Sequence, residues 1–305
     1  MLKTYHEPVM LKESIEAMDL RPGGVVVDCT LGGGSHSLAI LEKEPTVKLF
    51  SFDQDMDAVR HCKYLTEKYG DRITIINDNF ANLRTRLALE RVKNIDAILF
   101  DLGVSSHQID TAVRGFSYMR DGRLDMRMDQ QGDLTAETVV NEYSKEELVQ
   151  IFREYGEERE SSRIAAAICK YRKEQRLVTT GELAEIIDRA TKSKMKIKAR
   201  TRIFQALRVL INKELETLKI ALKDAVNILN PGGKIVVLTY SSLEDRIVKK
   251  YFLFEQLSCV CPVSFPRCLC SKQQRLIINR DLTPAEGDKD NIRARSARLR
   301  SATRL

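Results

Sequence analysis

A glycine-rich turn near the N-terminus is the first segment whose residue types could do chemistry. A run of valines leads to Asp28, and three consecutive glycines follow at 32–34 before a segment with helical spacing begins at Ser35. Glycine takes positive φ and lets a ligand lie directly on the main chain. The N-terminus of the following helix offers unpaired N–H groups to a polar or anionic ligand. A plain tight turn would show the same pattern, so the glycines alone favour neither interpretation.

Three further polar segments follow apolar runs, and they contain Asp53, Phe80 and Asp101. If the runs are parallel strands, their carboxyl ends meet at one edge of the sheet, where such sheets bind ligands. An acid at the end of the second strand, about 20 or more residues after the glycine turn, is placed to accept hydrogen bonds from ribose hydroxyls. Asp55 is the competing acid, and core packing alone would explain Phe80 as well as stacking on a purine. Together the strand ends predict a nucleoside-binding edge.

These side chains require strands and helices to position them. Apolar runs predict strands at 25–28, 48–53, 73–76 and 95–101, and a fifth that ends at 239. Between the fourth and fifth strands lie about a hundred residues with helical spacing, far more than a crossover connection needs. We therefore expect an α/β fold with a Rossmann-like sheet and an inserted all-helical domain at 110–200. Residues 1–109 and 201–305 would then form the two parts of the main domain.

Composition and motifs exclude several classes of protein. The 305 residues are 43% hydrophobic and 30% charged, which is typical of a soluble chain. No apolar run approaches the roughly 20 residues of a membrane span, and the N-terminus has no signal-peptide pattern. The sequence has no G-x4-G-K-[ST] motif of a P-loop, and its glycine spacing differs from the G-x-G-x-x-G of NAD-binding proteins. We expect a cytoplasmic protein that does not bind membranes.

Charge favours a polyanionic partner. The net charge is +7, and two basic runs without any acid lie at 189–202 and 292–304. Lysine and arginine gain affinity for nucleic acids by displacing counterions from phosphates. Either run alone would indicate only a solvated surface, but the two together favour RNA or DNA.

Four of the seven cysteines form a C-x-C-x6-C-x-C cluster at Cys259, Cys261, Cys268 and Cys270. Four thiolates could hold one tetrahedral zinc ion. The spacing differs from the common C-x2-C pairs, and a loop of reduced thiols is the alternative. We assign no metal at this point, and zinc binding stays open.

In order and almost end to end, the chain resembles the bacterial 16S ribosomal RNA cytosine-N4 methyltransferase family of the MraW type. The matching segments are residues 6–9, 28–37, 101–110, 114–129, 155–159, 201–208, 242–249 and 293–300. The most specific is 114–129 (RGFSYMRDGRLDMRMD), which we expect to be an ordered functional loop. The resemblance implies a methyltransferase sheet with a helical insertion and S-adenosylmethionine as the methyl donor. It also implies transfer to the exocyclic N4 amine of a cytidine in the decoding centre of 16S rRNA, in the small ribosomal subunit.

The resemblance also implies site residues. Those expected to contact the donor are Gly34, Ser35, His36, Asp53 at the ribose, Phe80 at the adenine, Asp101 and Gln108. Asp101 is in addition the candidate catalytic residue, since a carboxylate can accept hydrogen bonds from the amine as positive charge develops on its nitrogen. The transfer needs no metal. A base flipped out of its stack would pack on an aromatic side chain; the candidates are Phe116, Tyr118 and Tyr240.

This chain departs from the family pattern at three places. Ser35 and Ser241 stand where the family usually has glycine and histidine, and residues 198–202 replace a His-Pro-Ala-Thr-Arg segment. A divergent paralogue with another RNA target and an inactive RNA-binding or ribosome-assembly factor are therefore alternatives. A methyltransferase acting on protein or on a small molecule is a third, which the basic runs disfavour.

Overall fold

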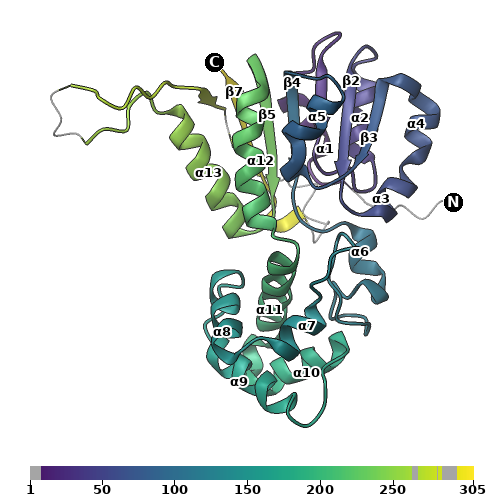
Figure 1. Ribbon diagram of the computed structural model, residues 1–305, viewed down its shortest axis with the longest axis vertical. Coiled ribbons are helices and arrows are strands. Elements are labelled where there is room, and N and C mark those ends of the chain that lie inside the picture. The colour runs from purple at the N-terminus through teal and green to yellow at the C-terminus, as the bar shows by residue number, and fades with distance from the viewer. Residues whose placement is uncertain (1–7, 263–266, 280, 284–293) are drawn as a thin grey trace. The chain divides into compact units, whose positions relative to one another are not determined.

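The computed structural model describes residues 8–262, 267–279, 281–283 and 294–305. Within these ranges the chain forms two compact units (Figure 1). The first combines the chain up to Gly103 with the chain from Leu215 onward, and the second runs from Val104 to Glu214. The second unit thus extends beyond the expected 110–200 at both ends, because the helices that flank this range pack within it.

The first unit is built on a seven-stranded sheet in the order β3-β2-β1-β4-β5-β7-β6. The strands are β1 (Val25–Asp28), β2 (Lys48–Asp53), β3 (Ile73–Asn77), β4 (Ile95–Asp101), β5 (Leu229–Thr239), β6 (Leu276–Ile278) and β7 (Arg298–Arg304). The first five are parallel, whereas β7 runs antiparallel to both β5 and β6. Strand order reverses at β1, between β2 and β4, which is the point where open α/β sheets bind ligands. This confirms the predicted Rossmann-like α/β fold.

Helices cover both faces of this sheet (Figure 1). Those of the first unit are α1 (Leu11–Met18), α2 (Ser35–Lys43), α3 (Met56–His61), α4 (Lys63–Tyr69), α5 (Leu83–Leu89), α12 (Glu214–Ile228) and α13 (Ser242–Gln256). Buried residues of α5, α12 and α13 pack with Phe50 and Phe100 on one face. Residues of α1, α2 and α4 pack with Leu49 and Leu99 on the other. Neighbouring strand residues face opposite layers, so the central strands are mostly apolar on both sides.

The C-terminal arginines are a correction to the sequence analysis. Residues 292–304 were expected to be a basic tail that grips phosphates, but 298–304 form β7 inside the sheet. Arg300 is only 6% exposed. Its guanidinium donates to both carboxylate oxygens of Asp245, at 2.6 and 3.1 Å, and to Asp281. An arginine held in this way is a structural residue. Arg293, in the same run, lies outside the described residues.

The second unit is helical where the structure describes it. Its helices are α6 (Ser106–Asp110), α7 (Ala136–Glu142), α8 (Lys145–Glu154), α9 (Ser161–Tyr171), α10 (Thr180–Ala190) and α11 (Lys196–Ile211). Residues 114–129 form an ordered segment without a long helix or strand, and Leu124 and Met126 from it are fully buried in the core of the unit. Arg114 anchors the segment by donating to the carbonyls of Arg127 and Met128. The segment is thus anchored by buried residues, while charged residues such as Arg120 and Arg123 stay exposed.

The helical spacing of apolar residues in the sequence predicts a helix over 6–20. The observed helix is Leu11–Met18, and residues 6 and 7 lie outside the described part of the chain. In the described ranges, no helix combines the length and the apolar character needed to cross a bilayer.

Candidate active site

The glycine turn between β1 and α2 is shaped by Gly34. This residue is the N-cap of α2 and has a φ of 79°, a conformation that side chains with a Cβ rarely adopt. A Cβ here would lie 2.8 Å from the Cys62 Sγ and 3.1 Å from the Leu65 Cδ1, so the site also lacks the space for one. Ser35 differs, because it is the first residue of α2 and does not have a positive φ. The serine at a usual family glycine therefore causes no backbone strain.

A buried polar network fixes the same turn from the end of β1. Asp28 is fully buried. One of its oxygens accepts the Thr30 N–H at 3.0 Å, and the other accepts the Ser37 hydroxyl at 2.7 Å. The Ser37 hydroxyl is also 2.8 Å from that of Ser51. Burial raises the pKa of Asp28, and nearby His36 partly offsets this. Both oxygens of Asp28 are thus used to hold the turn.

Asp53 connects the end of β2 to the glycine turn. One oxygen accepts the Gly32 N–H at 2.8 Å, and the other accepts the Asp55 N–H at 2.8 Å. Burial raises the pKa of Asp53 from 3.8 to about 7, and the two N–H donors limit the rise. The competing acid, Asp55, is 1% exposed and caps α3 by accepting the Asp57 N–H. Its position therefore favours Asp53 as the carboxylate available to a ribose.

His36, Asp101 and Tyr240 form a cluster where α2, β4 and β5 meet. The Tyr240 hydroxyl donates to one Asp101 oxygen at 2.6 Å, and the His36 Nδ1 lies 3.6 Å from the other. His36 is 4% exposed, and burial lowers its pKa, although Asp28 partly opposes this. The neutral imidazole is thereby favoured. The Asp101 main chain is fixed too, since its N–H donates to the Thr30 hydroxyl at 2.7 Å.

Sequence reasoning had considered Tyr240 only as an aromatic surface for a base. The signal for its hydrogen bond was present, because Tyr240 directly follows the last residue of β5 and so lies at the same sheet edge as Asp101. Burial and the Asp101 carboxylate raise its pKa well above 10, so the hydroxyl stays protonated and remains a donor.

Phe80 follows the end of β3, in a short 3-10 helix at Phe80–Asn82. Its ring packs edge to face on Phe100, with the ring centroids 5.7 Å apart. Phe80 is half-buried against the core of the sheet. This contact covers part of the Phe80 ring, and the role of Phe80 towards adenine stays a prediction.

The remaining expected site residues belong to the second unit. Gln108 is on α6, where its side chain accepts the Ser105 N–H in a capping box, and it is 5% exposed. Tyr118 packs edge to face on Phe204, and both it and Phe116 lie against the core of this unit. Each of these three side chains therefore has a structural role within its own unit.

The family histidine position also has a structural role here. Ser241 is the N-cap of α13: its hydroxyl accepts the Glu244 N–H at 3.3 Å, and the Glu244 side chain accepts the Ser241 N–H at 2.9 Å. This capping box fixes the chain directly after Tyr240, whose own N–H donates to Glu244 at 3.0 Å. A serine is well suited to this position because its short hydroxyl reaches the helix N–H groups.

The basic run at 189–202 divides into paired arginines and exposed lysines. Arg189, Arg200 and Arg202 form ion pairs with Glu185, Asp188 and Glu158, respectively. The exposed lysines are Lys192, Lys194 and Lys198. Arg189 is exposed as well, but it pairs with Glu185, so these lysines are the exposed cations of the run for which no ion pair is observed within the described residues.

The edge of the sheet has the features that S-adenosylmethionine would need. The glycine turn provides main chain that a ligand can approach, and Asp53 provides a carboxylate at the second strand end. The Nε2 of His36 is buried and has no hydrogen-bond partner among the described residues, and such an atom normally has one. A polar group of a bound ligand would satisfy it, so the residues present fit the donor.

Comparison with known proteins agrees with this geometry. Residues 3–305 match the MraW methylase family. Proteins called ribosomal RNA small subunit methyltransferase H are 47% identical in Carboxydothermus hydrogenoformans and 41% identical in Finegoldia magna, and in both the match covers 98% of this chain and 98% of the relative. A solved rRNA methylase structure from Streptococcus thermophilus aligns over the whole chain with a TM-score of 0.44 and 13% identity, which is too distant to bear on the site. The chain belongs to the MraW methylase family and is an S-adenosylmethionine-dependent methyltransferase.

Proposed function

We propose that this enzyme methylates the exocyclic N4 amine of a cytidine in the decoding centre of 16S rRNA, in the cytoplasm. The relatives are named for methylation of small-subunit ribosomal RNA, which supports RNA as the substrate class. The observation that supports an amine acceptor is Asp101, a carboxylate at the sheet edge that accepts a hydrogen bond from Tyr240 and lies 3.6 Å from the His36 Nδ1. The cytidine N4 position itself rests on the family resemblance.

On the donor side, the residues of the first unit have separate roles. The turn at Gly34 and Ser35 would lie against the donor, Asp53 would accept hydrogen bonds from its ribose hydroxyls, and Phe80 would face its adenine. When bound, the donor supplies an electrophilic methyl group on a sulfonium. The buried His36 Nε2, which has no hydrogen-bond partner among the described residues, would accept a hydrogen bond from the ligand or donate one to it.

On the acceptor side, the chemistry depends on a hydrogen-bond acceptor. The N4 amine of cytosine is a poor nucleophile, because its lone pair is delocalised into the ring. As the nitrogen attacks, positive charge develops on it, and a fixed carboxylate stabilises that charge by accepting an N–H. Asp101 is oriented by the 2.6 Å bond from Tyr240, so little reorganisation is needed when the charge develops. The same carboxylate can hold the amine in line for attack.

RNA binding is assigned to the exposed lysines of the second unit. Lys192, Lys194 and Lys198 lie close together in the sequence and take no part in the ion pairs that hold the arginines. Each phosphate contact releases counterions, so affinity should fall as salt rises, and each lysine removed should reduce the slope by about one.

The test is methyl transfer to small ribosomal subunits that lack this modification, with nucleosides identified by mass spectrometry. The expected product is N4-methylcytidine. Asp101→Ala and Asp101→Asn should each lower the rate by about a hundredfold or more, the usual range for a fixed group that stabilises charge in the transition state. Asp71→Asn is the control, since Asp71 is exposed on another part of the same unit. If Asp101→Ala transfers methyl at the wild-type rate, its proposed role is wrong.

Calorimetry with the donor separates the alternatives. Donor binding together with a different methylated nucleoside would indicate a different RNA target. Donor binding without any product would indicate an assembly factor, and label in protein instead of RNA would indicate a protein methyltransferase. Loss of donor affinity in Asp101→Asn would place this carboxylate on the donor side.

A further inference from the structure

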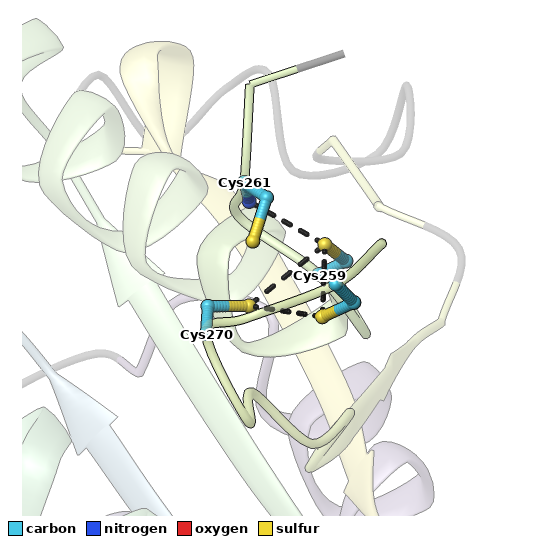
Figure 2. A group of neighbouring side chains, drawn as sticks. Cys259, Cys261 and Cys270 are labelled. Carbon is cyan, nitrogen blue, oxygen red and sulfur yellow. Dashed lines mark hydrogen bonds between the residues drawn. The ribbon is translucent and has the colours of Figure 1, made fainter. Parts of the chain in front are cut away.

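Four cysteines come together on the segment that joins α13 to β6. The Sγ atoms of Cys259, Cys261, Cys268 and Cys270 all lie within 4.8 Å of one another. Three of the distances are 3.4 Å between Cys259 and Cys268, 3.5 Å between Cys268 and Cys270, and 3.8 Å between Cys270 and Cys259. Figure 2 shows the sulfurs of the labelled Cys259, Cys261 and Cys270 turned towards one another.

Hydrophobic burial does not explain this cluster. Free cysteine normally behaves as a small buried apolar residue, yet Cys259 and Cys268 are exposed and the other two are half-buried. The apolar neighbours are also outside the core, because Val260 is 46% and Leu269 is 75% exposed. A segment that buries so little apolar surface needs another interaction to hold four sulfurs together.

The distances match a mononuclear tetrahedral site. Zinc binds cysteine sulfur at about 2.3 Å, and the edges of a tetrahedron of that size are about 3.8 Å. A disulfide would instead bring sulfurs to about 2.05 Å in pairs, whereas here all four sulfurs are mutually close and all four cysteines are free. One ion at the centre would contact every sulfur.

Main-chain N–H groups already point at the sulfurs. Val260 donates to the Cys270 Sγ and Leu269 donates to the Cys261 Sγ, both at 3.3 Å, and the Cys261 N–H donates to the Cys259 Sγ at 3.4 Å. Such donors stabilise the negative charge of metal-bound thiolates. The C-x-C spacing creates this pattern, since the residue within each pair offers its N–H to a sulfur of the opposite pair.

The segment is also anchored directly after the last cysteine. Glu255, at the end of α13, accepts two hydrogen bonds of 2.6 Å from Arg275 and lies 3.3 Å from the Lys272 Nζ. The carboxylate is 3% exposed, so this end of the segment is fixed to the sheet domain. The cysteines, once joined by a metal ion, would fix the other end of the segment.

We propose that Cys259, Cys261, Cys268 and Cys270 bind one zinc ion that clamps the segment between α13 and β6. Binding converts the thiols to thiolates and releases their protons to solvent, without any change of oxidation state. All four ligands come from the protein, which is typical of a structural site and leaves no position for substrate. The site is independent of the methyl-transfer edge.

The test measures metal in the full chain, purified under reducing conditions without added metal. Elemental mass spectrometry should find one zinc per chain. Replacement by cobalt(II) should give the visible absorption of a tetrahedral thiolate complex. Cys268→Ser should lose the bound zinc, whereas the matched control Cys169→Ser should keep it, because Cys169 is half-buried on α9, in the other unit.

Three results would overturn the proposal. The proposal is wrong if the wild-type protein contains no more zinc than the variant in which all four cysteines are changed to serine. The proposal is also wrong if the intact mass shows two disulfides in the reduced preparation. It is wrong as well if the protein contains bound iron in place of zinc. None of these readouts uses methyl transfer, so failure of the proposed function would leave this test unaffected. The wild-type measurement also stands if a serine variant does not fold.

Discussion

Replacing Gly34 by alanine tests whether the turn at the end of β1 is a cradle that only glycine can form. Two separate costs are expected. The residue has a φ of 79°, and its Cβ would lie 2.8 Å from the Cys62 Sγ and 3.1 Å from the Leu65 Cδ1. Cys62 and Leu65 are both fully buried, so neither can move into solvent.

The two costs can be estimated separately. A left-handed conformation costs a residue with a Cβ about 1–2 kcal/mol, and overpacking a tight core costs about 1–3 kcal/mol. Gly34→Ala should therefore lower the free energy of unfolding by about 2–5 kcal/mol. Gly23→Ala is the matched control, because Gly23 has a φ of 71° and nothing lies within 4 Å of the added Cβ. It should cost only the about 1–2 kcal/mol of the backbone.

The assay is urea unfolding followed by circular dichroism, with hydrogen exchange of residues 25–43 to localise the loss. Calorimetry of the folded variants measures donor affinity, which should fall by about tenfold or more for Gly34→Ala, because small displacements of positioning groups are costly. Gly23→Ala should bind the donor as the wild type does. The double variant with Cys62→Ala should show a favourable coupling of about 0.5–3 kcal/mol, since it removes the sulfur that the Cβ meets.

Equal destabilisation by Gly34→Ala and Gly23→Ala would refute the packing part of this reasoning. Unchanged donor affinity in a destabilised Gly34→Ala would refute the assignment of the turn to the donor.

The other predictions concern a proton, a hydroxyl and an arginine. The folded pKa of Asp53 is raised to about 7, so the native state binds more protons than the unfolded state between about pH 4 and 7. The free energy of unfolding should therefore fall as pH rises through this window. In urea titrations at several pH values, Asp53→Asn should reduce this dependence of stability on pH. Ribose hydroxyls donate to the charged form, so donor binding near pH 6.5 should release protons, measurable by calorimetry in buffers of different ionisation enthalpy, and Asp53→Asn should abolish the release. Tyr240→Phe should lower kcat by about tenfold to a hundredfold with little change in the KM for RNA, because a bond to the Asp101 carboxylate is lost; a change in KM alone would contradict this. Arg300→Ala should cost about 3–5 kcal/mol in unfolding experiments, because Arg300 is buried and pairs with the largely buried Asp245. Arg298→Ala should cost about 0–1 kcal/mol, because Arg298 is largely exposed.

The fold followed closely from the sequence, because its signals are local. Apolar runs of four to seven residues that end in Asp28, Asp53 and Asp101 are observed as β1, β2 and β4 with these same last residues. Each run is mostly apolar, since the central strands are covered on both faces. The C-terminal strand escaped prediction, because its three arginines outweigh its apolar residues and its burial depends on acids from distant segments.

For the candidate site, the sequence by itself determined which residues stand at the strand ends, and hence the class of ligand. Only the tertiary structure decided how they are used. It assigns Asp55 to a helix cap and Asp53 to the glycine turn, and it joins Asp101 to Tyr240, 139 residues away. It also gathers four sulfurs from two C-x-C pairs around one point. The physical reason is the same in each case: position along a strand is encoded locally, whereas hydrogen bonds and metal ligands depend on distances between segments that only packing brings together.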